Sequence, residues 1–224
     1  MHEYAERFAA YCDATFALTE QSEYQYQSLS ACVLDCVYSL RTQYYAVTIP
    51  IVDRYAAAYM CGNRNSPGDT ISLLLSRMED TGLQRFASEV LKNHQVLGGG
   101  AKIPKEQVCY KLAQYLKALN IETIDDFRAF EHQELLEAVI RAVKGMGDAG
   151  VNYLFMLAGD PTRCKPDVHI HHCIRDACGC DLGNEDCQRL FTDAVDILRH
   201  SYPSLTVRGL DGIIWRAYQR GKNP

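Results

Sequence analysis

The sequence predicts an all-α protein of about ten helices joined by short connections. Apolar residues recur with helical spacing along most of the chain. One such stripe consists of Leu29, Cys32, Val33, Cys36, Val37 and Leu40. Alternating runs rich in β-branched residues are nearly absent, and residues 204–209 are the best candidate for a strand. A hydrophobic content of 47% with 23% charged residues is typical of globular proteins and excludes the disordered and fibrous classes.

The first half of the chain is expected to form a series of helices and one loop. Helical spacing favours helices over residues 4–12, 29–40, 52–60, 70–79 and 82–92. Pro50 either starts a new helix or kinks the preceding one, because its ring removes an amide that a helix interior needs. Asp69 is a natural N-cap for the helix that follows it. Residues 97–104 include three consecutive glycines and predict a loop.

The second half continues the helical pattern. Helices are expected over residues 105–119, 121–130 and 134–143, followed by helices that begin near Asp148 and at Val168. The helix over 105–119 is strongly amphipathic, so one of its faces is expected to be buried.

Charge and targeting signals limit where the protein acts. The net charge of −5 argues against a chain that coats nucleic acid non-specifically, although five basic residues against one acid follow from Arg199 to the end. Neither a secretory signal nor an apolar stretch long enough to span a membrane is recognisable. We expect a soluble cytoplasmic protein, nucleoid-associated if bacterial, without a membrane partner. Its ten cysteines are then expected to be reduced thiols.

Two glycines form a turn between two of the expected helices. Gly145 and Gly147, separated by one apolar residue, allow positive φ and leave amide groups pointing outward. Such a turn beside a helix N-terminus suits a phosphate oxygen. A plain αα-hairpin without any ligand explains the same pattern and is the more frequent use of it.

An aspartate follows the helix after this turn. Asp167 comes after a proline and is a natural N-cap for a helix that starts at Val168. His169, His171 and His172 are better explained as surface or interface histidines than as metal ligands, because their spacing points them in different directions. Cysteines in the segment 164–187 fit neither an iron–sulfur motif nor a zinc ribbon. Core and surface thiols are favoured, with a zinc site as the lesser alternative, so no metal or cofactor is expected.

The turn, an apolar helix, a loop and Asp-Val-His, in that order, resemble the core motif of the helix-hairpin-helix DNA glycosylase superfamily, of the endonuclease III and mismatch adenine glycosylase type. By this resemblance Gly145, Met146 and Gly147 form the hairpin that binds DNA, and Asp167 is the catalytic aspartate. His169 takes the place of the motif histidine. The resemblance runs thinly from about residue 28 to the C-terminus, and only this unit of it is specific.

Two further stretches are similar to the same family. Residues 39–55 look like the early helix of the adenine glycosylase, with Thr42 and Gln43 in corresponding places. Residues 209–221 resemble the family's final helix, where an aspartate, a tryptophan and a basic residue recur.

The departures from the family pattern are informative. Bifunctional members carry a lysine where this chain has Ala149, so no Schiff base forms by the family's route and no strand cleavage is expected. The adenine glycosylase's early glutamate falls on or near Cys36, with Asp35 adjacent. A shift of one residue turns a helical side chain by about 100°. Adenine specificity is therefore not implied.

The resemblance implies a bilobal all-α fold with the cleft between two helical lobes. Residues 24–158 would form the lobe with the hairpin, and residues 1–23 together with 159–224 the lobe with the catalytic aspartate. The expected function is that of a monofunctional DNA N-glycosylase acting as a monomer, with double-stranded DNA and a flipped nucleotide as its partner. Arg41 would fill the gap and Lys144 would contact a phosphate. The pocket residues would be Gln43, Tyr44, Tyr45 and Trp215.

Two other functions stay open from the sequence. The same fold without activity would be a helix-hairpin-helix DNA-binding protein. A protein-interaction or metal-responsive role would rest on the segment 164–187. Which base is removed, and whether the substrate is damaged host DNA or modified foreign DNA, does not follow from the sequence.

Overall fold

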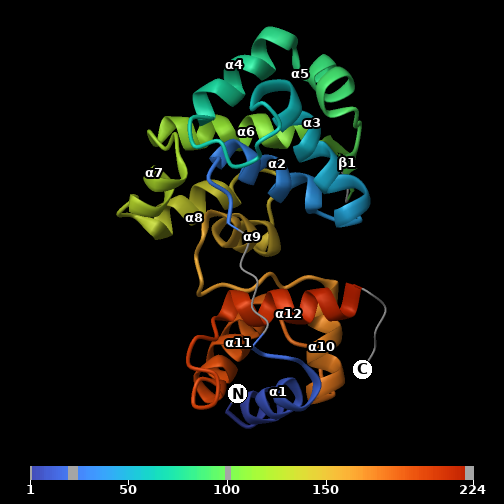
Figure 1. Ribbon diagram of the computed structural model, residues 1–224, viewed down its shortest axis with the longest axis vertical. Helices are drawn as coiled ribbons and strands as arrows, with labels where there is room; N and C mark the ends of the chain where they lie inside the picture. The colour runs from blue at the N-terminus through green and yellow to red at the C-terminus, as the bar shows by residue number, and fades with distance from the viewer. Residues whose placement is uncertain (1, 20–24, 99–101, 220–224) are drawn as a thin grey trace. The chain divides into compact units, whose positions relative to one another are not determined.

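The computed structural model describes residues 2–19, 25–98 and 102–219, and its chain is predominantly helical, which confirms the all-α class (Figure 1). The only β-structure in these residues is one short antiparallel pair. The chain divides into two compact units, one of residues Gln25–Ala158 and one of Met1–Tyr24 with Gly159–Pro224.

The continuous unit holds most of the elements. These are α2 Leu29–Ser39, π-helix η1 Tyr44–Thr48, α3 Ile49–Tyr59, α4 Ile71–Thr81, α5 Leu83–Arg85, π-helix η2 Phe86–Leu91, β1 Val96–Leu97, β2 Ile103–Pro104, α6 Lys105–Ala118, α7 Ile124–Ala129, α8 Gln133–Arg141 and α9 Asp148–Ala158. The other unit consists of α1 His2–Thr15, α10 Val168–Cys178, α11 Asn184–Leu198 and α12 Val207–Gln219.

Helix α2 is the centre of the continuous unit, because each of its residues from Leu29 to Ser39 is buried. A helix that is buried on all sides must be surrounded by neighbouring elements. Helices α3, α6 and α9 pack against it, as Figure 1 shows. The Ser28 side chain caps its start by accepting from the Ala31 amide at 3.1 Å. This central helix positions the segment that leaves it, which carries Arg41.

The discontinuous unit joins the two ends of the described chain. Helix α1 packs against α10 and α11, and α12 packs against the same pair. The Phe8 and Phe191 rings meet with centroids 5.1 Å apart in its core. Among the helices of the described ranges, none combines the length and apolar character that crossing a membrane requires.

Three local predictions were wrong or incomplete. Thr70, not Asp69, caps α4, because the Thr70 side chain accepts from the Leu73 amide. Asp69 is instead buried and paired with Arg77. Residues 204–209 form no strand, because α12 begins at Val207. The segment expected as a loop contains strands β1 and β2, paired in the register Val96 to Pro104.

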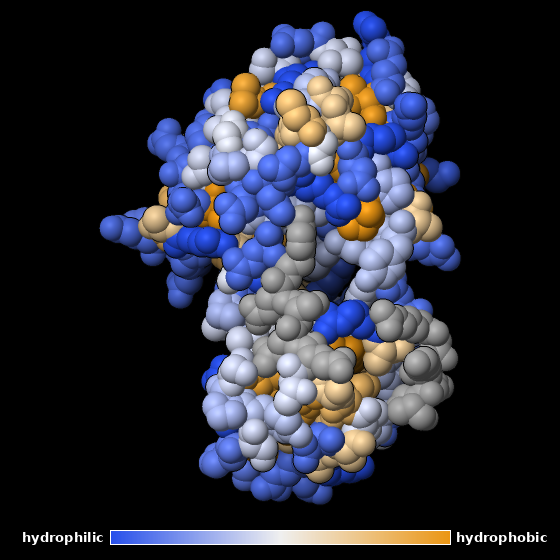
Figure 2. Space-filling view, in the orientation of Figure 1, coloured by the Kyte–Doolittle hydropathy of each residue, from blue (hydrophilic) through white to orange (hydrophobic). Residues whose placement is uncertain are grey.

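The surface has few large apolar side chains. On the face drawn in Figure 2, hydrophilic residues predominate and hydrophobic ones form separate patches. The exposed large hydrophobic residues described are Tyr4, Tyr45, Leu73, Val96, Leu135 and Val168. Tyr45 is one of the predicted pocket residues, and Val168 directly follows Asp167 in the sequence.

Candidate active site

The glycine turn is a tight connection from α8 to α9 that packing holds in place. Gly145 has φ +106°, and a Cβ there would lie 2.6 Å from Leu97 Cδ1, so both backbone and space require glycine. Met146 is buried, and its amide donates to the Val143 carbonyl at 2.9 Å. The Met146 side chain therefore packs inside the protein and its amide is already hydrogen-bonded, so Met146 does not face a ligand.

The outer side of this turn is open. Lys144, Gly145 and Gly147 are exposed, and a Cβ added to Gly147 would meet no atom within 4 Å. Packing within the protein therefore does not explain the glycine at position 147. Helix α9 begins at the next residue, and the first amides of a helix have no acceptor within the helix itself. Asp148, the first residue of α9, is paired with Arg141.

Arg41 belongs to the same unit as this turn. It has φ +55°, the left-handed region, and is exposed. Its Nη1 donates to the Gly98 carbonyl at 2.7 Å, directly after Leu97, the residue that packs on Gly145. Arg41 and the glycine turn thus contact two consecutive residues, Gly98 and Leu97.

The residues after Arg41 are anchored by a buried carboxylate. Asp35 is fully buried and accepts hydrogen bonds from Tyr26 and Tyr44 at 2.7 Å and from Tyr153 at 3.0 Å. Burial, followed by the negative charge of Asp35, raises the pKa of the Tyr44 phenol. Tyr44 is therefore fixed as a neutral donor. In the sequence Asp35 stands out only as a neighbour of Cys36, and its anchoring role depends on the tyrosines that meet it in the fold.

Gln43 and Tyr45 flank this anchored tyrosine. Gln43 is exposed, and its carbonyl accepts from the Val47 amide at 3.0 Å. Tyr45 has 59% of its surface exposed and packs edge-on against the Tyr44 ring at 5.4 Å between centroids. A large aromatic ring held in this way offers a face on which a base can stack.

In the other unit, Asp167 is the N-cap of α10, as predicted. Its Oδ1 accepts from the His169 amide at 2.9 Å and from the Ile170 amide at 3.3 Å. Its carbonyl accepts from the His171 amide, and its side chain is half-buried. Both side-chain cap bonds use one carboxylate oxygen, so Oδ2 is the oxygen that can meet a ligand.

A second carboxyl lies behind the loop that carries Asp167. Asp211, on α12, is 5% exposed, and its Oδ2 accepts from the Lys165 amide at 2.8 Å. The Lys165 carbonyl in turn accepts from the Asp167 amide at 2.6 Å. Burial, and then the negative charge of Asp167, raise the pKa of Asp211 to about 8. Asp211 is therefore mostly protonated at neutral pH.

Aromatic side chains stand beside this cap. The rings of His169 and Trp215 meet edge to face with centroids 6.2 Å apart, and both residues are half-buried. Val168, directly after Asp167, has 58% of its surface exposed. Next to the polar groups of Lys165 and Asp211, the residues that follow Asp167 therefore add an exposed apolar side chain and an aromatic pair.

The cysteine- and histidine-rich segment 164–187 lies wholly within the described residues. No three His, Cys, Asp or Glu side chains there are arranged to hold an ion. The nearest approach is that of Cys187 Sγ and His171 Nδ1, at 3.7 Å. Cys173, Cys178 and Cys187 are buried, and His172 is exposed. These positions fit the interpretation as core thiols and surface histidines.

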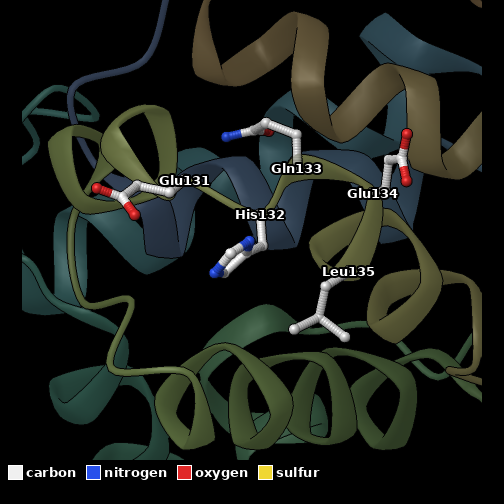
Figure 3. A pocket seen from close by; sticks show the side chains of 5 residues that line it. All are labelled: Glu131, His132, Gln133, Glu134 and Leu135. Carbon is white, nitrogen blue, oxygen red and sulfur yellow. The ribbon is translucent and has the colours of Figure 1, made fainter.

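One surface pocket, of about 600 Å³, lies away from these residues (Figure 3). It is lined by the consecutive residues Glu131, His132, Gln133, Glu134 and Leu135. In Figure 3 their side chains point in different directions and do not converge on one point. A ligand site needs converging polar groups, so this pocket is not a candidate.

The predicted site residues thus form two clusters. Arg41, Gln43, Tyr44, Tyr45 and the turn 144–147 belong to the continuous unit, and Asp167, His169 and Trp215 to the discontinuous one. The basic residues Arg220 and Lys222 lie outside the described residues.

A glycine turn with an open outer face and a capping aspartate beside aromatic side chains characterise this all-α chain. The chain belongs to the family described as Domain of unknown function (DUF8548), whose model matches residues 6–220. No curated protein and no solved structure matches it.

Proposed function

We propose that the protein is a monofunctional DNA N-glycosylase, which extrudes a damaged, mismatched or modified base from duplex DNA and hydrolyses its N-glycosidic bond. The two units would be the two lobes of a helix-hairpin-helix glycosylase-like fold with a DNA cleft. This proposal extends the resemblance found in the sequence.

The observation that carries the proposal is the geometry of Asp167. The carboxylate is fixed by two amide donors on one oxygen, which leaves the other oxygen for a ligand. A fixed negative charge stabilises the positive charge that develops on deoxyribose as the base leaves. The exposed Val168 side chain and the paired rings of His169 and Trp215 offer apolar and aromatic surface for a nucleoside.

The reaction has a simple balance. The bond from C1′ to the base nitrogen breaks, its electron pair leaves with the base, and the base takes up a proton. Water, oriented by the Asp167 carboxylate, then forms the new bond to C1′ and loses a proton. The products are a free base and an abasic sugar. Ala149 stands where an amine would be needed for strand cleavage, so the abasic strand stays intact.

The other cluster would hold the DNA. The exposed backbone at Gly147 and the Lys144 side chain contact a phosphate, which gives a grip independent of sequence. Arg41 fills the space of the extruded base, and Tyr45 stacks on a base. The localisation and partners follow from this function: duplex DNA in the cytoplasm or nucleoid, bound by a monomer.

The decisive experiment measures base release. The protein and its Asp167→Asn variant are incubated with duplexes that carry a panel of lesions and modified bases, and strand breaks are compared with and without hot alkali. Breaks that need alkali and disappear in Asp167→Asn support the proposal, and the reactive duplex names the base. Breaks without alkali would show that the reading of Ala149 is wrong.

Asparagine is chosen because it keeps the cap. Asn and Asp are about equally good at an N-cap, whereas Ala lowers the free energy of unfolding by about 1 kcal/mol. Asp167→Asn should therefore unfold at the wild-type temperature while losing base release. Asp181→Asn, an exposed carboxylate in the same unit, is the matched control and should retain activity.

Binding without catalysis is the second candidate function. The observation in its favour is that both side-chain bonds of Asp167 are accounted for by helix capping. Phosphate binding needs only the turn. Because a Cβ at Gly147 meets no atom, Gly147→Val should leave the fold intact and weaken binding to a fluorescent duplex at least tenfold, or about 1.4 kcal/mol. Gly68→Ala, at another open glycine, is the control. Binding that depends on Gly147, without base release from any duplex, would favour this second function.

A further inference from the structure

A buried lysine lies under the segment that carries Arg41. Lys105, the first residue of α6, is 1% exposed. The three protons on its Nζ are shared among four oxygen atoms, the Tyr38 carbonyl at 2.9 Å, the Leu40 carbonyl at 2.9 Å, Thr42 Oγ1 at 2.7 Å and Gln95 Oε1 at 3.0 Å. The proposed chemistry gives this group no part.

The acceptors of Lys105 share one feature: all but one belong to residues 38–42. Helix α2 ends at Ser39, and the last carbonyls of a helix receive no hydrogen bond from an amide of that helix. The ammonium group supplies that partner to the carbonyls before Arg41 and to the hydroxyl after it. Arg41 itself makes no bond to Lys105 and projects from the exposed side of this turn.

The conformation so held is one that arginine does not prefer. Arg41 has φ +55°, where a Cβ crowds the backbone, and in most proteins glycine or asparagine occupies such a position. A strained, exposed residue is kept in place only when its surroundings determine the backbone on both sides. Here Lys105 acts before and after Arg41, and the Asp35–Tyr44 bond anchors the chain three residues further on.

A second contact fixes the direction of the Arg41 side chain. The Lys105 amide donates to the Gln95 carbonyl at 2.9 Å, and the Gln95 side chain accepts from Lys105 Nζ. Gln95 leads directly into β1, after which the Gly98 carbonyl accepts from the Arg41 guanidinium. One lysine therefore orders both the turn that presents Arg41 and the strand that receives it.

We propose that Lys105 is the positioning residue of Arg41, and that it holds the arginine ready to enter the base stack of duplex DNA before DNA binds. The inference rests on the proposed function, in which Arg41 fills the space of the extruded base. Preorganisation of this kind removes an ordering cost at the moment of binding.

The first test needs no DNA. Trypsin cleaves after arginine only where the chain adopts an extended conformation, so the tight turn should protect the bond after Arg41. Lys105→Met keeps the buried aliphatic chain and removes the donors. It should accelerate cleavage after Arg41 at least about tenfold, the ratio expected from losing hydrogen bonds to a charged group. Lys111→Met, an exposed lysine of the same helix, should leave the cleavage rate unchanged. Equal rates in wild type and Lys105→Met would overturn the proposal.

The second test asks whether Lys105 acts through Arg41. The probes are a duplex with a tetrahydrofuran abasic analogue and the same duplex intact. Wild type, Lys105→Met, Arg41→Ala and the double variant are compared for their preference for the abasic duplex. Lys105→Met should reduce this preference about tenfold in the wild-type background and not at all beside Arg41→Ala. An equal reduction in both backgrounds would overturn the proposal, because it would mean that Lys105 acts only on the fold.

A second variant, Thr42→Val, is used if Lys105→Met does not fold. It removes one of the four acceptors without changing side-chain shape. It should produce the same changes at smaller amplitude, and unchanged trypsin protection would count against the proposal. A wild-type protein without any preference for the abasic duplex would refute the proposed function, while the trypsin comparison would still decide whether Lys105 positions Arg41.

Discussion

Replacing Asp211 by asparagine should change how the stability of its unit depends on pH. Burial and the charge of Asp167 raise the pKa of Asp211 to about 8, whereas an aspartate in the unfolded chain titrates near 4. Between these values the folded state binds one proton more than the unfolded state. The free energy of unfolding therefore falls with rising pH, by about 1.4 kcal/mol per pH unit from this carboxyl alone.

The sign and the size of the effect follow from this difference. Below about pH 4 the carboxyl is neutral in both states and its stabilising contribution is complete, and that contribution is lost as the pH rises towards 8. Between pH 5 and pH 7 the loss amounts to about 3 kcal/mol. Asparagine is neutral throughout and keeps an oxygen for the Lys165 amide. The variant should therefore gain about 3 kcal/mol over wild type between these two pH values.

Trp215 makes the measurement specific to this unit. It is the single tryptophan of the chain and lies on α12, the helix that carries Asp211. Its fluorescence during urea unfolding at a series of pH values reports the unit concerned, even if the two units unfold separately. Charged groups around Asp211, namely Asp167, Lys165 and Arg208, are the same in both proteins, so the difference between the curves isolates one carboxyl.

Parallel pH curves for wild type and Asp211→Asn would refute this reasoning. They would mean that Asp211 is ionised in the folded protein at neutral pH. Asp181→Asn, which removes an exposed carboxylate of the same unit, serves as the control and should reproduce the wild-type slope.

Three further results are expected. Gly145→Ala should lower the free energy of unfolding, measured by chemical denaturation, by about 1–3 kcal/mol, because it combines an unfavourable φ with a clash against Leu97. An unchanged denaturation midpoint would contradict the turn geometry. Tyr44→Phe should lower it by about 1–2 kcal/mol, because the buried Asp35 carboxylate loses one of its donors, and a neutral effect would mean that water replaces the hydroxyl. In the native protein a thiol reagent should modify the exposed Cys61 before the other cysteines, and fast reaction of the buried thiols would indicate local opening.

Much of the helical architecture could be predicted from periodicity. The stripe from Leu29 identified α2, the amphipathic run after Pro104 identified α6, and Asp167 was recognised as the cap of α10. These are local signals, in which spacing or a single capping residue decides the conformation. The prediction of Asp69 as a cap was wrong for the same reason. A carboxylate directly before a helix is typical of an N-cap, but here Asp69 pairs with Arg77.

The two organising groups of the candidate site could not be predicted in this way. Asp35 and Lys105 acquire their roles from partners distant in sequence, such as Tyr153 and Leu40. A weak signal existed for Lys105, which stands three and seven residues before Val108 and Leu112 and so belongs to the buried stripe of its helix. A lysine in an apolar stripe indicates burial, but the sequence does not show which oxygen atoms accept its hydrogen bonds.

The discontinuous unit has a consequence for the order in which the chain folds during synthesis. Helix α1 is synthesised well before α10 and α11, but its apolar residues, including Phe8, are covered by these two helices. The ring that meets Phe8 belongs to Phe191, so at ordinary rates of translation α1 waits on the order of ten seconds for its partner. The continuous unit can fold during that time. Any chain that terminates before α11 would display a finished unit preceded by a helix whose apolar face is uncovered, which chaperones and proteases recognise readily.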